Sequence, residues 1–131
     1  GEWNEGSTWE ALIFACHHRL DNLTFVVDLN GLQGFGTTDE VATMSSLAEK
    51  LRTFGLTLQE IDGHNPADIC NALLPTGTGC PHAVVAHTTK GHGVSFMEDK
   101  MEWHYLPMTL EQYTKAVQEV EASCAMSSVT A

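Results

Sequence analysis

Residues 23–29 read LTFVVDL, and residues 30–38 that follow read NGLQGFGTT. The first stretch is short and rich in β-branched and aromatic residues, and it is apolar on both faces, which is typical of a strand buried between helices. Three glycines make the second stretch a loop. A buried strand that ends in a polar, glycine-rich loop predicts an α/β fold, and the remaining segments extend that prediction.

Helices and strands alternate along the rest of the chain. We expect helices at residues 7–19, 40–54, 66–74 and 110–122, and further strands at residues 56–61 and 82–88. Ser7 or Thr8 is the expected cap of the first helix, with Glu10 at capping-box spacing from Ser7, and Asp39 and Thr109 cap two later helices. This order predicts a parallel sheet with helices on its faces.

The size of the predicted sheet indicates an incomplete domain. Three strands are few for a parallel sheet covered on both faces, so we expect part of a doubly wound parallel-sheet domain. The domain is expected to span residues 1–122, and residues 123–131 form a small, polar, flexible tail.

Composition excludes several classes of function. The 131 residues include 6 Lys and Arg against 17 Asp and Glu, for a net charge of −11. Such a chain lacks the clustered positive charge that a nucleic-acid surface needs. A local phosphate site built from backbone N–H groups or a metal does not depend on net charge. The sequence holds no run of 18 apolar residues, so we expect no membrane-spanning helix.

The cysteines indicate a reducing compartment. Cys16, Cys70, Cys80 and Cys124 match no zinc-site spacing, and Cys16 and Cys70 lie among apolar residues, as buried thiols do. Free thiols without a visible signal peptide predict a cytoplasmic protein.

The polar residues concentrate where the predicted strands end. In open parallel sheets, ligands bind beyond the carboxyl ends of the strands. Asp28 and Asn30 supply a carboxylate and an amide oxygen there, which suit a hard cation, although Asn30-Gly31 alone is also a common turn. Lys90 precedes a glycine loop that either faces a phosphate or is simply mobile. His104 is either a proton carrier or an ordinary surface residue.

Four segments taken in order carry a resemblance to a known family. They are GEWNEGSTWEA (1–11), LDNLTFVVDLNGLQ (20–33), IDGHN (61–65) and AHTTKGHGVSFMEDKMEWHY (86–105). Together they resemble the domain of the transketolase family that grips the diphosphate of thiamine diphosphate, above all in the split transketolases, where this domain is a separate polypeptide. The resemblance implies transfer of a two-carbon ketol unit from a ketose to an aldose.

The resemblance also implies roles for individual residues. Gly1 is similar to the last glycine of the family's GDG turn, and Asn30 to the asparagine that, with a backbone carbonyl corresponding to Leu32, binds Mg²⁺ or Ca²⁺. Lys90 is similar to a lysine that faces the cofactor, and His104 to the histidine of a WHG stretch near cofactor and substrate. In this chain Tyr105 replaces that glycine.

Two acidic residues complete the predicted site. Glu5 and Glu10 are similar to acidic residues of a network that links paired active sites across a subunit interface, which places them with His104 in the catalytic set. Without the resemblance, both carboxylates are explained by their place near a helix N-terminus. Because such a network joins two subunits, the resemblance also implies an oligomer.

Part of the family pattern falls outside this sequence. The Asp of the GDG turn would precede Gly1, and the upstream half of the domain and the pyrimidine-binding domain are not in it. We expect complementary transketolase polypeptides or segments to supply them, and sugars or sugar phosphates as substrates. A non-catalytic scaffold or regulatory partner of a complete enzyme, or another thiamine-diphosphate enzyme, is the alternative.

Overall fold

The computed structural model describes residues 1–127, and its centre is a three-stranded parallel sheet. The strands β1 (Thr24–Leu29), β5 (His82–His87) and β4 (Thr57–Asp62) lie in the order β1-β5-β4. Five of the six β5 residues are buried, whereas β1 and β4 form the two edges. The predicted α/β fold with parallel strands is confirmed.

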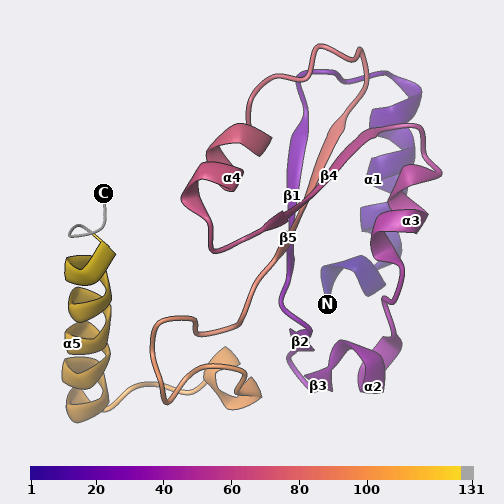
Figure 1. The fold of residues 1–131 in the computed structure, drawn as a ribbon. Coiled ribbons are helices and arrows are strands. Elements are labelled where there is room, and N and C mark those ends of the chain that lie inside the picture. The colour runs from indigo at the N-terminus through magenta and orange to yellow at the C-terminus, as the bar shows by residue number, and fades with distance from the viewer. Residues whose placement is uncertain (128–131) are drawn as a thin grey trace.

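The strand β1 is covered on one face only, which corrects the expectation that it is buried on both. Val27 is 3% exposed, but Val26, whose side chain points to the opposite face, is 57% exposed. Figure 1 shows α1 (Gly6–His17) and α3 (Leu47–Arg52) on one side of the sheet and α4 (Pro66–Ala72) on the other. The helix α4 packs against β4, and within residues 1–127 Val26 stays exposed on that face of β1.

The hydrophobic core lies between the sheet and the helices α1 and α3. Its buried members are Leu12, Val27, Leu47, Leu51, Leu56, Ala83 and Val85. Trp3 and Trp9 pack against this cluster, and the indole N–H of Trp9 donates to the Trp3 carbonyl at 2.9 Å. Fully burying one such leucine side chain stabilises the fold by roughly 1.5–3 kcal/mol, so this face accounts for most of the packing.

The cap predicted for the first helix is wrong. The helix α1 follows Glu5, which shows no side-chain hydrogen bond at the cap, and the predicted bond from Ser7 to Glu10 is not made. The Thr8 hydroxyl instead donates to the Glu2 carbonyl at 2.8 Å. The short 3-10 helix η1 (Glu2–Asn4) precedes α1, so the chain turns into the helix earlier than expected.

The helix predicted over residues 40–54 is two shorter helices. The first, α2 (Thr38–Ala42), is capped by Thr37 through a capping box with Glu40 rather than by Asp39. The Thr43 hydroxyl donates to the Asp39 carboxylate at 2.9 Å and accepts the Ser45 N–H at 3.2 Å. Such local side-chain bonds compete with the backbone hydrogen bonds that would continue the helix. Ser46, at φ 61°, is the N-cap residue of the next helix, α3.

Two of the predicted loops contain regular structure. The glycine-rich residues 30–38 include the antiparallel pair β2 (Leu32–Gln33) and β3 (Gly36–Thr37). The long loop after β5 includes the 3-10 helix η2 (Met101–His104). These elements have only two to four residues each, too few for a periodic pattern to be visible in the sequence.

The last helix, α5 (Leu110–Ser127), confirms Thr109 as its cap and extends past its predicted end at residue 122. The Gln112 N–H donates to the Thr109 hydroxyl oxygen at 3.2 Å, and the Thr109 N–H donates to the Gln112 side chain at 2.9 Å. The helix runs through residues 123–127, where good helix formers such as Ala125 continue it. The remaining four residues of the predicted tail, 128–131, lie outside the described part of the chain.

The expectation of no transmembrane helix agrees with the described helices. Within residues 1–127, no helix combines the length and the apolar character needed to cross a membrane. Cys16 is only half-buried and Cys70, in α4, is exposed, so the prediction of two buried thiols is wrong for Cys70 and only partly met for Cys16.

Candidate functional site

The side-chain carboxylate of Asp28 links the C-terminal ends of the strands β1 and β5. The Thr88 hydroxyl donates to Oδ1 of Asp28, and Nδ2 of Asn30 donates to Oδ2 of Asp28 at 3.0 Å. The other end of the Asn30 amide, Oδ1, accepts the Leu32 N–H at 3.0 Å. The Asn30-Gly31 step is therefore a turn, with Gly31 at φ 74°, and the turn also directs the Asn30 amide.

Three of the predicted cofactor and metal residues line one small cavity. Gly1, Asn30 and Leu32 lie around a space of about 40 Å³, together with Asp28 and Gly31. A space of that size holds a water molecule or a single ion, since one probe sphere needs about 10–15 Å³. The fold thus brings residues from the first position and from the end of β1 together.

The donor set of this cavity is incomplete for a divalent cation. Among residues 1–127 there is no group of three or more His, Cys, Asp or Glu side chains that could hold a metal ion. Asn30 and the Leu32 carbonyl are neutral, and the Asp28 carboxylate is already engaged by Thr88 and Asn30. Because Mg²⁺ needs near-octahedral oxygen donors, these residues fit as part of a site whose charged ligand lies elsewhere.

A buried donor beside this cavity also lacks an acceptor. Nε2 of Gln33 is buried and has no hydrogen-bond partner among the described residues. The Gln33 side chain lies next to Gly1, where a Cβ on that glycine would be 3.4 Å from its Oε1. An unpaired buried N–H costs about 1–3 kcal/mol, so the environment fits a further oxygen acceptor, such as an anionic group.

Lys90 lies in a compact turn. It follows Thr88 on the same edge of the sheet, and its carbonyl accepts the Asp99 N–H at 3.0 Å. Gly91 has φ 73°, and a Cβ there would be 2.6 Å from the Met97 carbonyl oxygen, so only glycine fits. The half-buried Lys90 therefore has a fixed backbone close to the Asp28–Thr88 contact.

His104 lies against the β2–β3 hairpin. A Cβ on Gly34 would be 3.6 Å from Cδ2 of the His104 ring, so the imidazole stands next to the strand that begins with Leu32. The neighbouring Trp103 fixes this segment, because its indole N–H donates to the Phe96 carbonyl at 2.9 Å. The imidazole is exposed.

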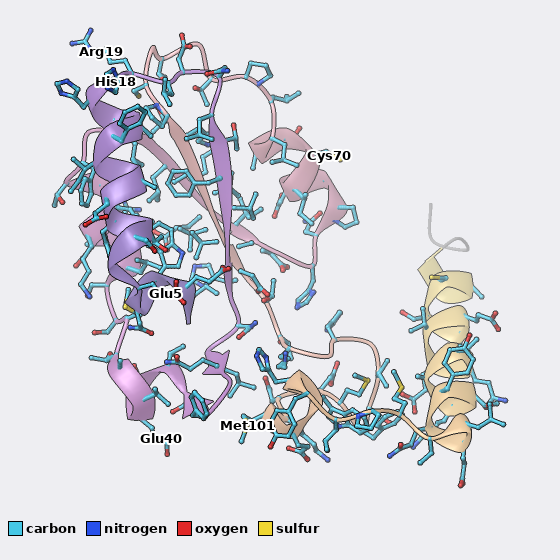
Figure 2. All side chains as sticks on the ribbon, turned by 180° about the vertical axis from the view of Figure 1, so that it is seen from behind. Glu5, His18, Arg19, Glu40, Cys70 and Met101 are labelled. Atoms are coloured by element: carbon cyan, nitrogen blue, oxygen red, sulfur yellow. The ribbon has the colours of Figure 1, made fainter. Side chains whose placement is uncertain are left out.

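Glu5 and Glu10 are not brought to the cavity beside Asn30. Glu5 instead lines a groove of about 390 Å³ along the free side of β1, with Phe25 and Val26 on its floor. Figure 2 shows Glu5 at the start of α1, well away from Met101 in η2. Glu10 is exposed on α1. Neither carboxylate therefore belongs to the cavity beside Asn30.

Thr88 and His64 belong to this edge, although the sequence did not single out either for a role. Thr88 contacts Asp28 across 60 positions, and Nε2 of His64 accepts the Thr89 N–H at 2.7 Å. The sequence feature that could have indicated these two residues was their position at the ends of predicted strands. Which strand ends are neighbours depends on the strand order, which the sequence does not specify.

A charged cluster lies at the outer edge of β4. The Arg52 guanidinium donates to Glu60 at 2.6 Å, and Nε2 of His87 lies 3.2 Å from the second carboxylate oxygen. The Arg52 hydrogen bond, followed by that of His87, lowers the pKa of the Glu60 carboxyl. This cluster ties α3 to the sheet and has no contact with the cavity beside Asn30.

Comparison with known proteins agrees with this geometry. The model of the family described as "Transketolase, thiamine diphosphate binding domain" matches residues 1–123. The chain is 40% identical over 122 residues to one of the subunits of the apulose-4-phosphate transketolase of Phocaeicola vulgatus, covering 92% of this chain and 43% of that protein. It is 40% identical to the 6-deoxy-6-sulfo-D-fructose transketolase subunit SqwG of a Clostridium species, covering 92% and 45%.

A solved structure is similar as well. The transketolase of Campylobacter jejuni superimposes with a TM-score of 0.84 at 26% identity, covering 92% of this chain and 19% of that one. The chain thus spans less than half of the length of the curated relatives it matches.

Proposed function

The chain belongs to the family of transketolase thiamine diphosphate-binding domains, and from this premise we propose that it supplies part of the diphosphate site of a thiamine-diphosphate-dependent transketolase. The reaction transfers a two-carbon ketol unit from a ketose to an aldose. Bound thiamine diphosphate supplies the carbanion-stabilising chemistry, and the protein supplies binding, orientation and proton transfer. The observation that carries this proposal is the convergence of Gly1, Asn30 and Leu32 on one cavity at the carboxyl edge of the sheet.

The chain's own residues have distinct roles in this proposal. Asn30 and the Leu32 carbonyl bind a divalent cation, Mg²⁺ or Ca²⁺, whose charge allows an acidic protein to hold a diphosphate. Lys90, in the turn that follows β5, and the Gly1 backbone, which lines the cavity, bind the cofactor. His104 exchanges a proton with the substrate or positions it from the η2 side.

The uncovered side of β1 supports a complementary segment or polypeptide. One edge of β1 has no strand partner among residues 1–127, and the apolar groove beside it is open. An unpaired strand edge next to an apolar surface is normally covered. We place there the upstream half of the domain, which also brings the missing acidic metal ligand. The pyrimidine-binding domain and a second copy complete an oligomer, in whose contacts Glu5 and Glu10 take part.

We infer the substrate class from the relatives and the location from the cysteines. Two similar proteins are named for a sugar phosphate and a sulfonated sugar, so we propose sugars or sugar phosphates as donor and acceptor. Cys16, Cys70 and Cys80 are free thiols, which supports a cytoplasmic protein.

Calorimetry on the assembled protein tests the proposal. Thiamine diphosphate is titrated with and without Mg²⁺, and the expected result is binding that requires the metal. Absence of cofactor binding overturns the proposed function. Cofactor binding without ketol transfer to any aldose favours another thiamine-diphosphate enzyme, and stable association with a complete transketolase without cofactor binding favours the scaffold.

A further inference from the structure

His64 lies directly behind the segment that carries Lys90. It follows β4, whereas Lys90 follows β5, and these two strands are neighbours in the sheet. The sequence separates the two residues by 26 positions. The parallel register brings their strand ends to the same edge, since Asp62 is opposite His87.

Four local contacts hold the backbone around His64. The His64 N–H donates to the Asp62 carboxylate at 2.9 Å, and the Gly63 N–H donates to the His87 carbonyl at 2.8 Å. A Cβ at Gly63 would be only 2.4 Å from Cγ2 of Thr88, so the two turns are in close contact. Asn65 then caps α4 by accepting the Ala67 N–H at 3.0 Å. The imidazole is thus presented from a fixed support.

The His64 ring contacts the chain on both sides of Lys90. Its Nε2 accepts the Thr89 N–H at 2.7 Å, one residue before the lysine. Its ring stacks on His92, two residues after the lysine, with centroids 3.8 Å apart and planes 24° apart. Because Nε2 accepts this bond, the ring proton of the neutral imidazole is on Nδ1.

We propose that His64 is a positioning residue for the cofactor site, and that it holds the Lys90 turn in place through the Nε2 bond to the Thr89 N–H. This inference rests on the proposed function, because it concerns the direction of Lys90 toward the diphosphate. The bond satisfies an N–H that β5 no longer pairs, since the strand ends at His87. A lysine whose backbone is fixed loses less conformational freedom when its ammonium meets an anion.

Two substitutions distinguish the effect of the His64 hydrogen-bond acceptor, Nε2, from the effect of its aromatic ring. His64→Phe keeps an aromatic ring to stack on His92 and removes the acceptor. His64→Gln loses the ring, but its side-chain oxygen can reach the place of Nε2. His87→Phe is the matched control, because it removes a histidine from the same edge that contacts Glu60 and not the Lys90 turn.

The affinity of the assembled protein for thiamine diphosphate with Mg²⁺ is the first readout. We expect a loss of about 10- to 100-fold for His64→Phe, as for other supporting residues of a site, and little change for His64→Gln and for the control. In a Lys90→Ala background, His64→Phe is expected to cause no further loss, since its effect passes through that lysine. Equal losses in both backgrounds, or no loss in the Phe variant, overturn the proposal.

Amide hydrogen exchange is the second readout and needs no cofactor. The Thr89 amide is expected to exchange at least about tenfold faster in His64→Phe and at the wild-type rate in His64→Gln. An unchanged rate in the Phe variant contradicts the positioning role even if cofactor binds. If the wild-type protein binds no thiamine diphosphate but the variants show this exchange pattern, the proposed function and the cofactor part of this inference are overturned. Only the contact between His64 and the Lys90 turn then remains.

Discussion

The side-chain amide of Asn30 donates a hydrogen bond of 3.0 Å to the Asp28 carboxylate two residues earlier. This contact fixes which end of the amide is the donor, so Oδ1 accepts the Leu32 N–H, and Asn30 lines the cavity beside Gly1. In the proposed site this neutral oxygen is the Asn30 ligand of the cation. Asp28 thus orients its neighbour and does not act as the free anionic ligand of the cavity.

We predict that Asn30→Ala weakens metal-dependent binding of thiamine diphosphate by at least about tenfold in the assembled protein, because the variant removes both a donor oxygen and the turn that directs it. Calorimetry with and without Mg²⁺ measures the change. Asn22→Ala, an exposed asparagine before β1, is the control and should bind as wild type does. Equal affinities for all three proteins would remove Asn30 from the site.

His104→Ala is expected to lower turnover at least about tenfold, which is within the range for loss of an acid–base or positioning group. The imidazole is exposed beside Gly34, so its loss leaves the core intact. Steady-state kinetics of the assembled enzyme gives the result, with Tyr105→Phe as the control on the neighbouring exposed side chain. Wild-type turnover in the alanine variant would make His104 an ordinary surface residue.

Gly63→Ala should destabilise the protein by about 1–3 kcal/mol, the usual cost of forcing atoms into a packed site. Its Cβ would lie 2.4 Å from Thr88 Cγ2 and 3.0 Å from the His87 carbonyl oxygen. Chemical denaturation of the full protein measures the free energy of unfolding. Gly6→Ala is the matched control, because nothing lies within 4 Å of a Cβ there, and it should be neutral or slightly stabilising.

The Glu60 cluster predicts a pH dependence of stability. Its carboxyl has a lowered pKa in the folded state, chiefly through Arg52 and then His87, so its contribution is present above the unfolded pKa and is lost as pH falls through the folded pKa. Because the side chain is 37% exposed, we expect Glu60→Gln to cost under about 1 kcal/mol at pH 7. Denaturation at pH 7 and pH 3 should show this difference shrinking at the lower pH, and a constant difference would contradict it.

Patterns with clear periodicity were predictable from the sequence. The strands β1, β4 and β5, the start of α4 at Pro66 and the Thr109 cap follow from apolar runs and from residues with strong positional preferences. The break between α2 and α3 was missed because it depends on local hydrogen bonds of Thr43 to its neighbours. The spacing of apolar residues in the sequence gives no sign of such bonds. The extension of α5 to Ser127 was missed because residues 123–131, taken together, are mostly small or polar and so resemble a chain tail.

The candidate site was predictable as a set of strand ends, but not as a set of contacts. Asn30 and Leu32 follow β1 directly, so their proximity was visible in the sequence. The bonds from Thr88 to Asp28 and from Thr89 to His64 join different strands, and they depend on β5 lying between β1 and β4. The position of Gly1 at the same cavity depends on the tertiary fold as a whole.

The central position of β5 sets the order in which the sheet can be built during synthesis. Among the described residues, β1 and β4 pair only with β5, which is the last of the three to leave the ribosome. Neither strand can form its hydrogen bonds to β5 until residues 82–87 are synthesised, so this part of the sheet stays open until then. Contacts of such long sequence separation slow folding, and a ribosome that stalls before residue 82 would display an aggregation-prone chain.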